Sequence, residues 1–458
     1  MSDNSTISHE TLAGRYDLVS LMEKNPGFYP FFLETTAKAT KTDAASFDIL
    51  FAFPQQILVK HADNSVTLNG EDCSSDVFLD ELDRIWGHES DRFDRNPQFP
   101  FSGGWFVYLG YELVNEIEPT IELQGLDDRE PIAFAVRIPV AVIYDHDQDQ
   151  THIVVENEHK NRIKEIHSTL KNNKQIVTAS QSKLIAEIDE SPSQSYINSV
   201  ATILDYIREG DVFQVNLSRL WQANLNVDVT EIDVYRKLRH ANPAPYSAIV
   251  KFDQFSIVSS SPERLISTHG DKIETRPIAG TRPRGTTVDS DADLQTELIT
   301  NHKERAEHIM LIDLERNDLG RICVPGSINV NEFMVLESYA HVHHIVSNIS
   351  GKLNKGVSPG QTIKAVFPGG TITGCPKVRC MEIISELEQE GRGAYTGSLG
   401  YLNHNGDMDL NILIRSLTIK DKQISFRAGA GIVADSIAER EVDETRAKAK
   451  GIIMALQG

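Results

Sequence analysis

The chain has 458 residues and a mass of 51.1 kDa, which is enough to bury a large core, and its composition is typical of a globular protein. Its formal net charge of -21 argues against nucleic acid or an anionic membrane as the main partner. No signal-peptide pattern and no apolar run of roughly 20 residues is visible. The four cysteines have neither disulfide-scaffold density nor metal-binding spacing, so we expect a reduced, cytoplasmic protein.

The first part of the chain is predicted to form mainly strands, because its apolar stretches are short and rich in β-favouring side chains. We expect a helix at 16–23 and strands at 28–36, 46–54, 101–111, 131–144 and 152–156. Residues 169–190 are polar and rich in lysine, and we place a domain boundary there. The predicted division is an N-terminal region at 1–185 and a catalytic domain at 186–458.

The second part is predicted to begin with a helix, because apolar residues recur at helical spacing from Ile197 to Ile207 and Gly210 can end the helix. We expect strands at 212–218, 246–252, 255–260, 398–402, 410–418 and 423–428, and helices at 302–315, 376–388 and 437–456. Many strand connections are short or carry turn residues. The predicted fold is therefore α+β, a two-layer antiparallel β-sheet sandwich with helices on the outer faces.

One stretch, residues 274–285, combines three arginines with two prolines and two glycines. An arginine side chain can pair with two oxygens of a carboxylate or phosphate at once, and glycines let the backbone approach a ligand closely. In a chain this acidic, the stretch predicts a pocket for an anion. An exposed basic turn is the alternative.

Two predicted helices carry paired acidic residues. Glu304 and Glu307 share a face of one helix, and Glu441 and Glu444 share a face of the other, with Lys448 one turn beyond. One carboxylate from each helix, together with waters and substrate oxygens, is a common way to hold Mg²⁺. Solvated helix faces with ion pairs are the alternative.

Two glycine-rich segments offer backbone N–H groups to an anion. Residues 368–377 form a turn that runs into a predicted helix, and residues 428–432 follow a predicted strand. The first segment lacks the Gly-Lys-Ser/Thr ending of a P-loop, so we exclude a nucleoside triphosphate site.

Taken together, these segments resemble the chorismate-utilising enzymes. The resemblance is dense from Ser193 to Ala455 and reaches back to about Phe28. It is carried by motifs in a common order, at 210–218, 261–264, 277–281, 302–308, 313–318, 370–377 and 428–431.

The resemblance implies roles for the residues at matching positions. Glu263 and His344 match the general acid/base positions around the departing C4 hydroxyl of chorismate, and such a poor leaving group needs an acid. Glu307 and Glu444 match the Mg²⁺ ligands, with Glu304 beside the metal. The implied substrate contacts, in which Tyr395 and Arg415 hold the enolpyruvyl carboxylate, are Gly280, Thr281, Tyr395, Arg415, Gly429, Ala430, Gly431 and Lys448.

The nucleophile follows from position 214. The water-using members of the family carry a lysine base in this strand, whereas this chain carries Gln214, which cannot act as a base. The resemblance therefore implies ammonia as the nucleophile, and a separate glutamine amidotransferase subunit as the partner that supplies it.

Two ammonia-using branches of the family remain open. The stretches at 47–54, 100–105, 110–113, 242–247 and 368–371 resemble the branch that forms aminodeoxychorismate, which we favour. That branch typically carries a lysine where this chain has Ala279, and alanine is the form of the anthranilate-producing branch. Ala279 excludes a covalent lysine intermediate at this position.

The N-terminal half also resembles a tryptophan pocket of these enzymes. The matching positions are Thr35, Ser46, Phe47, Asp48, Ile49, Pro245, Tyr246 and Ser247. The resemblance implies that tryptophan binds there, as a structural ligand or as an inhibitor, with ordinary core packing as the alternative.

Overall fold

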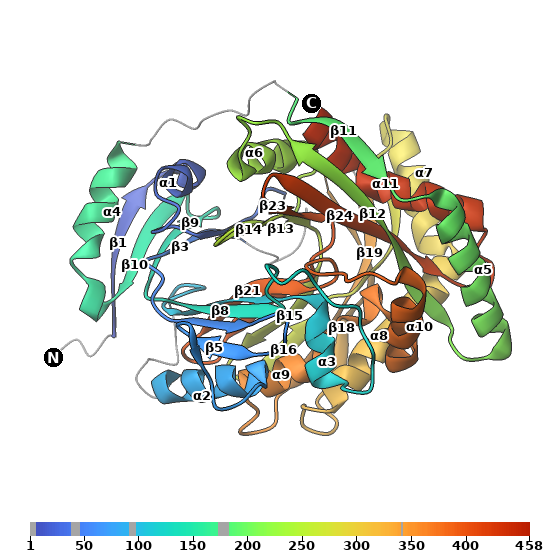
Figure 1. Ribbon diagram of the computed structural model, residues 1–458, viewed down its shortest axis with the longest axis horizontal. Helices are drawn as coiled ribbons and strands as arrows, with labels where there is room; N and C mark the ends of the chain where they lie inside the picture. The colour runs from blue at the N-terminus through green and yellow to red at the C-terminus, as the bar shows by residue number, and fades with distance from the viewer. Residues whose placement is uncertain (1–5, 38–45, 91–97, 173–182, 340–341) are drawn as a thin grey trace.

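Two large antiparallel sheets pack face to face in the computed structural model, which describes residues 6–37, 46–90, 98–172, 183–339 and 342–458 (Figure 1). The first sheet runs in the order β1 (Ile7–Ala13), β10 (Gln150–Glu156), β9 (Val140–Asp145), β3 (Phe47–Ala52), β2 (Phe31–Glu34), β13 (Tyr246–Phe252), β14 (Phe255–Ser261), β23 (Ser416–Lys420), β24 (Gln423–Ile432), β12 (Gln214–Leu225) and β11 (Ile185–Glu190), and β20 (Gly374–Cys375) also pairs with β12.

The second sheet contains the remaining strands. Its order is β17 (Ile278–Pro283), β19 (Val342–Lys352), β16 (Lys272–Thr275), β15 (Arg264–His269), β22 (Met408–Asn411), β21 (Ser398–Asn403), β7 (Gly104–Leu109), β8 (Ala133–Ile138), β4 (Ile57–Lys60), β5 (Val66–Leu68) and β6 (Glu71–Asp72), and β18 (Asn329–Ser338) also pairs with β19.

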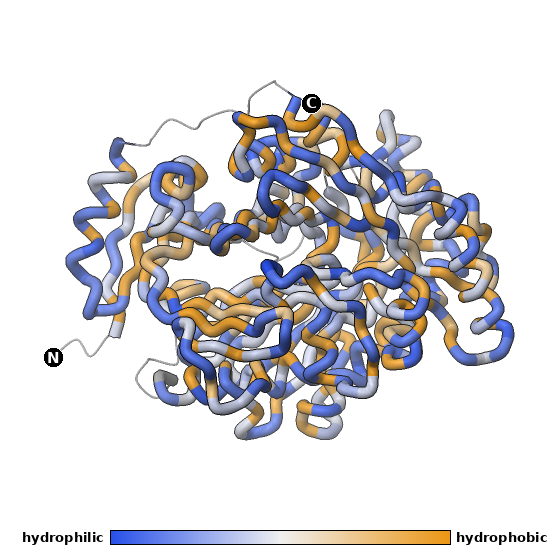
Figure 2. Tube along the Cα trace, in the orientation of Figure 1, coloured by the Kyte–Doolittle hydropathy of each residue, from blue (hydrophilic) through white to orange (hydrophobic). Residues whose placement is uncertain are grey.

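Between the sheets lies an aromatic core to which both contribute. Phe31 and Phe51 of the first sheet pack with Phe106 and Phe134 of the second, and the Phe31 and Phe106 rings stack with centroids 4.2 Å apart. Figure 2 shows hydrophobic segments along the strands and hydrophilic segments in the outer turns. This core is what joins the two layers.

Helices cover the outer faces of both sheets, which confirms the predicted sandwich. Those packed on the first sheet are α1 (Leu18–Lys24), α4 (Arg162–Lys171), α5 (Ser193–Glu209), α6 (Glu231–Ala241) and α11 (Ala438–Gln457). Those packed on the second are α2 (Phe78–Ser90), α3 (Val114–Ile117), α7 (Val288–Thr300), α8 (His302–Gly320) and α9 (Pro359–Val366). Helix α10 (Lys377–Glu388) packs against apolar side chains of both sheets. No helix in the described ranges is long and apolar enough to cross a membrane.

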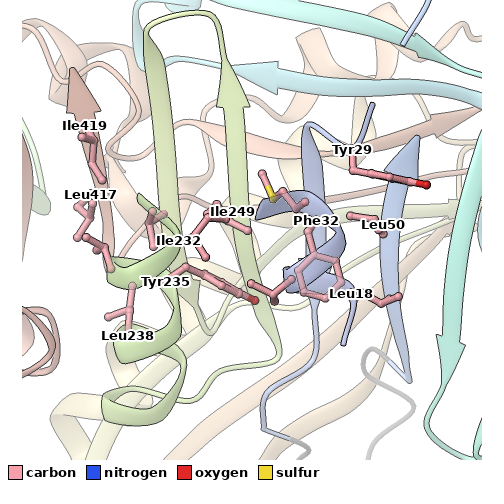
Figure 3. Close-up of a cluster of buried hydrophobic side chains, with 14 of the residues drawn as sticks. Leu18, Tyr29, Phe32, Leu50, Ile232, Tyr235, Leu238, Ile249, Leu417 and Ile419 are labelled. Atoms are coloured by element: carbon pink, nitrogen blue, oxygen red, sulfur yellow. The ribbon is translucent and has the colours of Figure 1, made fainter. Parts of the chain in front are cut away.

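The α6 interface illustrates how helical periodicity creates this packing. Ile232, Tyr235 and Leu238 recur three residues apart, so they share one helix face. That face packs against the sheet near Ile249 and Leu417 (Figure 3). At the N-terminus of α6, Thr230 and Asp233 form a capping box, which satisfies backbone N–H groups of the first turn.

Two of the predicted strands were wrong in a way that matters for the site. The segment at 131–144 is two strands, β8 and β9, which lie in different sheets on either side of Pro139. The segment at 410–418 is likewise split into β22 and β23 by residues 412–415. In each case the chain leaves one sheet and enters the other, and a similar crossing between β14 and β15 contains Glu263.

The two halves of the chain share both sheets. Strand β2 pairs with β13, and β7 pairs with β21 along six residue pairs from Leu109↔Ser398 to Gly104↔Asn403. The predicted division at 185/186 stays a prediction about folding units, but it does not separate one sheet from the other.

Candidate active site

A cavity of about 180 Å³ opens between the two sheets. It lies where two segments that cross from one sheet to the other meet, residues 262–263 between β14 and β15 and residues 412–415 between β22 and β23. The crossing segments are tied together, because the Ile412 N–H donates to the Glu263 carbonyl oxygen over 3.0 Å. Eight of the residues predicted from the sequence line this cavity: Glu263, Gly280, Thr281, His344, Tyr395, Arg415, Gly429 and Lys448. They come from both sheets and from α11, so only the folded sandwich brings them together.

Glu263 is a buried carboxyl group at the cavity wall. Burial raises its pKa to about 7, with the Thr371 hydroxyl, the Ile278 backbone and the Arg415 and Lys448 cations acting in the opposite direction. One of its carboxyl oxygens, Oε1, is buried without a hydrogen-bond partner. Near neutral pH a large fraction of this group therefore carries a proton that it can donate.

His344 lies on β19, opposite β17. Burial, followed by the charge of Arg415, lowers its pKa to about 3, so the imidazole is neutral at physiological pH. Its Nδ1 lies 2.9 Å from the Thr281 hydroxyl oxygen. A β-bulge at Gly280 sets this register, since Thr281 pairs with His344 only after the shift, and the positive φ of 72° at Gly280 suits a glycine.

The cavity is lined by cations that fit an anionic ligand. The Arg415 side chain forms no hydrogen bond or ion pair within the described residues, and burial holds its pKa below the usual arginine value, with Glu263 opposing. Lys448 donates to the Gly429 carbonyl oxygen over 2.9 Å and forms an ion pair of 2.9 Å with Glu444. Because Arg415 keeps all its donors available, it is suited to a carboxylate.

Carboxylates from α8 and α11 lie beside this cavity. Burial raises the pKa of Glu307 to about 7, and the charges of Glu304, Asp435 and Glu444 raise it further against Lys303. Such mutual repulsion between carboxylates is relieved by a divalent cation, and oxygen ligands suit Mg²⁺. Within the described residues, no three acidic, histidine or cysteine side chains converge on one metal position, so an ion here would need water and ligand oxygens as well.

The arginine-rich stretch does not form the predicted anion pocket. All three arginines are paired with carboxylates: Arg276 with Glu332 and Glu337, Arg282 with Glu297 and Glu304, and Arg284 with Asp291. The backbone and hydroxyl of the same stretch, at Gly280 and Thr281, do line the cavity. The cations that face it come from elsewhere in the chain.

The remaining predicted positions lie close to the cavity wall. Gln214 and Gly431 are in contact, because a Cβ on Gly431 would stand 2.2 Å from the Gln214 amide nitrogen. Ala430 directs its side chain into the apolar cluster beneath α5 and α10, so only its backbone faces the sheet interior. Ala279 is buried on β17 between two lining residues, Ile278 and Gly280.

A second, smaller cavity of about 70 Å³ contains most of the predicted tryptophan positions. Thr35, Phe47, Ile49, Pro245, Tyr246 and Ser247 line it. Asp48 does not, since its carboxylate accepts a hydrogen bond from the Thr35 N–H and pairs with Arg15 and His146. Ser46 is also absent from the lining. Tryptophan binding stays a prediction.

Sequence reasoning missed three polar residues of the main cavity, Asn216, Thr371 and Arg427. Asn216 and Thr371 lie within motifs that had been recognised, and their side-chain direction was the missing information. Arg427 immediately precedes the 428–432 segment on β24. The sequence does not indicate which face of the sheet its side chain takes, so its position in the cavity was not predicted.

Comparisons with known proteins identify relatives of this chain. Residues 30–454 match the model of the chorismate binding enzyme family. The chain is 44% identical over 379 residues to aminodeoxychorismate synthase component 1 of Bacillus subtilis, covering 80% of this chain and 79% of the relative. It is 40% identical over 380 residues to anthranilate synthase component 1 of Aquifex aeolicus, covering 78% and 75%.

A solved structure shares the architecture. The crystal structure of anthranilate synthase component I from Streptococcus pneumoniae superposes with a TM-score of 0.79 at 32% sequence identity, over 90% of this chain and 93% of that one. A sandwich of this kind is thus found in a relative as well. The chain belongs to the family of chorismate-binding enzymes.

Proposed function

We propose that this protein is the chorismate-aminating component of an aminodeoxychorismate synthase, which converts chorismate and ammonia to 4-amino-4-deoxychorismate. The observation that carries amination is Gln214, which stands where a water-activating base would be needed. The identity of 44% to the Bacillus subtilis protein supports the branch. The relatives are named as components, which supports a separate glutamine amidotransferase subunit as the source of ammonia.

The residues of the cavity suit the chemistry of this reaction. Chorismate is a dianion, and Arg415 with Tyr395 would hold its enolpyruvyl carboxylate. This role is supported by the position of both side chains in the lining of the cavity. Protonated Glu263 gives its proton to the C4 hydroxyl, so that the C–O bond breaks and water leaves. The neutral imidazole of His344, oriented by Thr281, is a proton acceptor on the same wall.

We also propose that Glu307 and Glu444 hold Mg²⁺, with Glu304 beside it. When bound, this ion would neutralise the ring carboxylate of chorismate. The proposal is supported by the crowding of carboxylates that raises the pKa of Glu307. Replacing Glu307 with Gln is expected to abolish Mg²⁺-dependent turnover, and unchanged Mg²⁺ dependence would remove this assignment.

Anthranilate synthase activity is the second candidate. It is favoured by Ala279, which cannot form the covalent intermediate that a lysine forms in the aminodeoxychorismate branch. It is also favoured by the anthranilate synthase relatives of Aquifex aeolicus and Streptococcus pneumoniae. An aminodeoxychorismate synthase with alanine here must complete the reaction without a lysine adduct.

Product analysis distinguishes the two candidates. Purified protein is incubated with chorismate, Mg²⁺ and ammonium, and the products are separated by chromatography with and without a downstream lyase. We expect aminodeoxychorismate to accumulate and 4-aminobenzoate to appear only with the lyase. Anthranilate and pyruvate formed without a lyase would establish the second candidate instead, and a Glu263→Gln variant controls for uncatalysed reaction.

Tryptophan binding at the smaller cavity is a separate proposal, supported by the six predicted positions that line it. We expect tryptophan to release or absorb heat in calorimetry and to raise the melting temperature. Phenylalanine serves as the control ligand. If millimolar tryptophan gives no heat and no shift in melting temperature, the cavity is ordinary core packing.

A further inference from the structure

A buried arginine, Arg392, lies behind the wall of the main cavity. It follows α10 in the chain, and its side chain is 1% exposed. Arg392 does not belong to the lining of the main cavity, whereas it lines a neighbouring cavity of about 170 Å³. Tyr395 and Arg427 line both cavities, so Arg392 stands behind the wall that the two cavities share.

Every N–H group of the Arg392 guanidinium has an acceptor. A guanidinium carries five N–H groups. Its Nε and Nη2 donate to the two carboxylate oxygens of Glu388 over 3.0 and 2.7 Å. Nη2 also donates to the Asn216 carbonyl oxygen over 2.8 Å, and Nη1 donates over 3.3 Å to the Ile372 carbonyl oxygen and to the Thr396 hydroxyl oxygen. Arg392 therefore has no donor left for a ligand.

These acceptors connect Arg392 to the residues that shape the main cavity. Asn216 on β12 and Ile372 in η3 (Gly370–Ile372) both line it. Thr396 directly follows Tyr395, which lines it too. One side chain thus holds three separate segments of the cavity wall in fixed positions relative to one another and to the end of α10.

The Arg392 cation also lies over two tyrosine rings. Its Cζ is 4.9 Å from the ring centroid of Tyr111 and 5.5 Å from that of Tyr395, distances at which a cation is attracted to the face of a ring. Burial raises the pKa of Tyr395 to about 12, against the charge of Arg392, so its hydroxyl stays protonated at neutral pH. The Tyr395 hydroxyl is therefore a hydrogen-bond donor on a ring that Arg392 helps to fix.

The backbone of Arg392 is held by the N-terminal half of the chain. The N–H groups of Arg392 and Gly393 donate to the Glu112 carboxylate over 2.7 and 3.0 Å. Glu112 and Tyr111 both lie in η1 (Tyr111–Leu113), and neither lines the main cavity. A segment remote from the ligand site thus supports its wall through Arg392.

We propose that Arg392 is a positioning residue for chorismate: without contacting the ligand, it holds the Tyr395 ring and the backbone at Asn216 and Ile372 where the enolpyruvyl carboxylate binds. This inference rests on the proposed binding of chorismate. A lysine at position 392 would keep the charge, but its ammonium group has three donors and no planar fork. It could not replace all five hydrogen bonds, so the wall segments would lose their fixed positions.

The test measures chorismate binding by calorimetry with Mg²⁺ and without ammonia, so that no amination takes place. We expect Arg392→Lys to raise the Kd for chorismate about tenfold, roughly the effect of losing one or two hydrogen bonds. In assays with ammonium, the KM for chorismate should rise by a similar factor while kcat falls less than about threefold. The reason is that a contact remote from C4 contributes to the ground state and the transition state alike.

Arg137→Lys is the matched control. Arg137 is also buried and forms an ion pair of 2.7 Å with Glu156, the same distance as between Arg392 and Glu388, but it lines neither cavity. Both variants should lower the melting temperature, and only Arg392→Lys should weaken chorismate binding. Equal weakening in both variants would show that lost stability is responsible and would overturn the proposal.

A double-mutant cycle tests whether Arg392 acts through Tyr395. Tyr395→Phe removes the hydroxyl and keeps the ring. We expect Arg392→Lys to raise the Kd about tenfold in the wild-type background and about threefold or less in the Tyr395→Phe background, because the hydroxyl that Arg392 positions is already absent there. The same factor in both backgrounds would contradict the proposal.

A second variant keeps the test decisive if Arg392→Lys does not fold. Tyr111→Leu removes one of the two rings beneath the Arg392 cation and changes no residue of the main cavity lining, and we expect it to raise the Kd for chorismate about threefold. Unchanged affinity in this variant would overturn the inference while the proposed function stands. If the wild-type protein binds no chorismate, the proposed function fails and the inference fails with it.

Discussion

Glu263 shows how the position of a single carboxyl group determines its chemistry. Burial raises its pKa to about 7, so it is protonated below this pH and ionised above it. An acid that must deliver a proton to a leaving hydroxyl works only in its protonated form. We therefore expect kcat/KM for chorismate to fall as pH rises through about 7, when the concentration of unprotonated ammonia is held constant.

The Glu263→Gln variant identifies the group responsible for this decrease. Its kcat is expected to be lower by roughly 10²- to 10⁴-fold, the usual contribution of a general acid, with little change in the KM for chorismate. The remaining rate should no longer decline near pH 7. If the decline persists in the variant, another group controls it and the assignment of Glu263 as the acid is wrong.

The Arg415 side chain lowers the stability of the fold and at the same time leaves a cation available to bind the ligand. It has a positive φ of 51°, lacks an ion-pair partner within the described residues, and lies where burial disfavours its charge. Replacing a poorly compensated buried charge by an apolar side chain of similar length often stabilises a protein. We expect Arg415→Met to raise the free energy of unfolding by about 1 kcal/mol, and to raise the KM for chorismate at least a hundredfold, measured by denaturant titration and by steady-state kinetics.

The control for Arg415 is Arg264, which is half-buried and forms an ion pair of 2.8 Å with Asp409. Arg264→Met removes one partner of that pair and leaves a carboxylate uncompensated, so it should lower stability. A loss of stability in both variants would contradict the inference that the charge of Arg415 destabilises the protein when no ligand is bound.

Among the elements, the bulge in β17 positions Thr281 opposite His344 and brings Gly280 next to Glu304. Gly280 has a φ of 72°, and a Cβ there would stand 2.7 Å from a Glu304 carboxyl oxygen and 2.9 Å from Leu298 Cδ1. Gly280→Ala should therefore destabilise the protein by roughly 2 kcal/mol, through backbone strain and crowding together, and should lower kcat at least tenfold by displacing Glu304.

Gly270 provides the matched comparison for this variant. Its φ of 61° is similar, but a Cβ there meets nothing within 4 Å. Gly270→Ala should cost only the strain, about 1 kcal/mol, and leave kcat unchanged. Equal losses of stability and activity in both variants would show that the contact with Glu304 is unimportant.

Some of these elements could be predicted from the sequence and others could not. Helix α5 ends at Gly210 as predicted, because its apolar spacing and a left-handed glycine with φ of 86° are local signals. Strands β22 and β23 were merged, because a run of apolar residues does not reveal that the chain changes sheet at residues 412–415. Arg415 was nevertheless identified through the family resemblance, whereas Asn216 depends on side-chain direction and appeared only in the folded structure.

At the scale of the molecule, charge is distributed so that an acidic protein can bind a dianion. The chain carries a formal charge of -21, yet Arg415, Arg427 and Lys448 face one cavity between the sheets. Exposed charges are screened within about 10 Å at moderate ionic strength, so the net charge of the surface acts weakly in the cavity. Arg427 is paired there with Glu388 and Glu390, and Lys448 is paired with Glu444, which leaves Arg415 as the one of the three without an ion-pair partner among the described residues. The sandwich brings these three cations together from the segment before β23, from β24 and from α11.

The two-sheet architecture predicts that neither half of the chain folds alone. Residues 186–458 would expose the edges of β13 and β21 that pair with β2 and β7, together with half of the aromatic core. We expect fragments 1–185 and 186–458, made separately, to lack a cooperative thermal transition in circular dichroism, and to recover one when they are co-expressed. A fragment 186–458 that unfolds cooperatively and turns over chorismate by itself would show that the predicted boundary separates independent domains, and that the shared sheets add stability without being required for the fold.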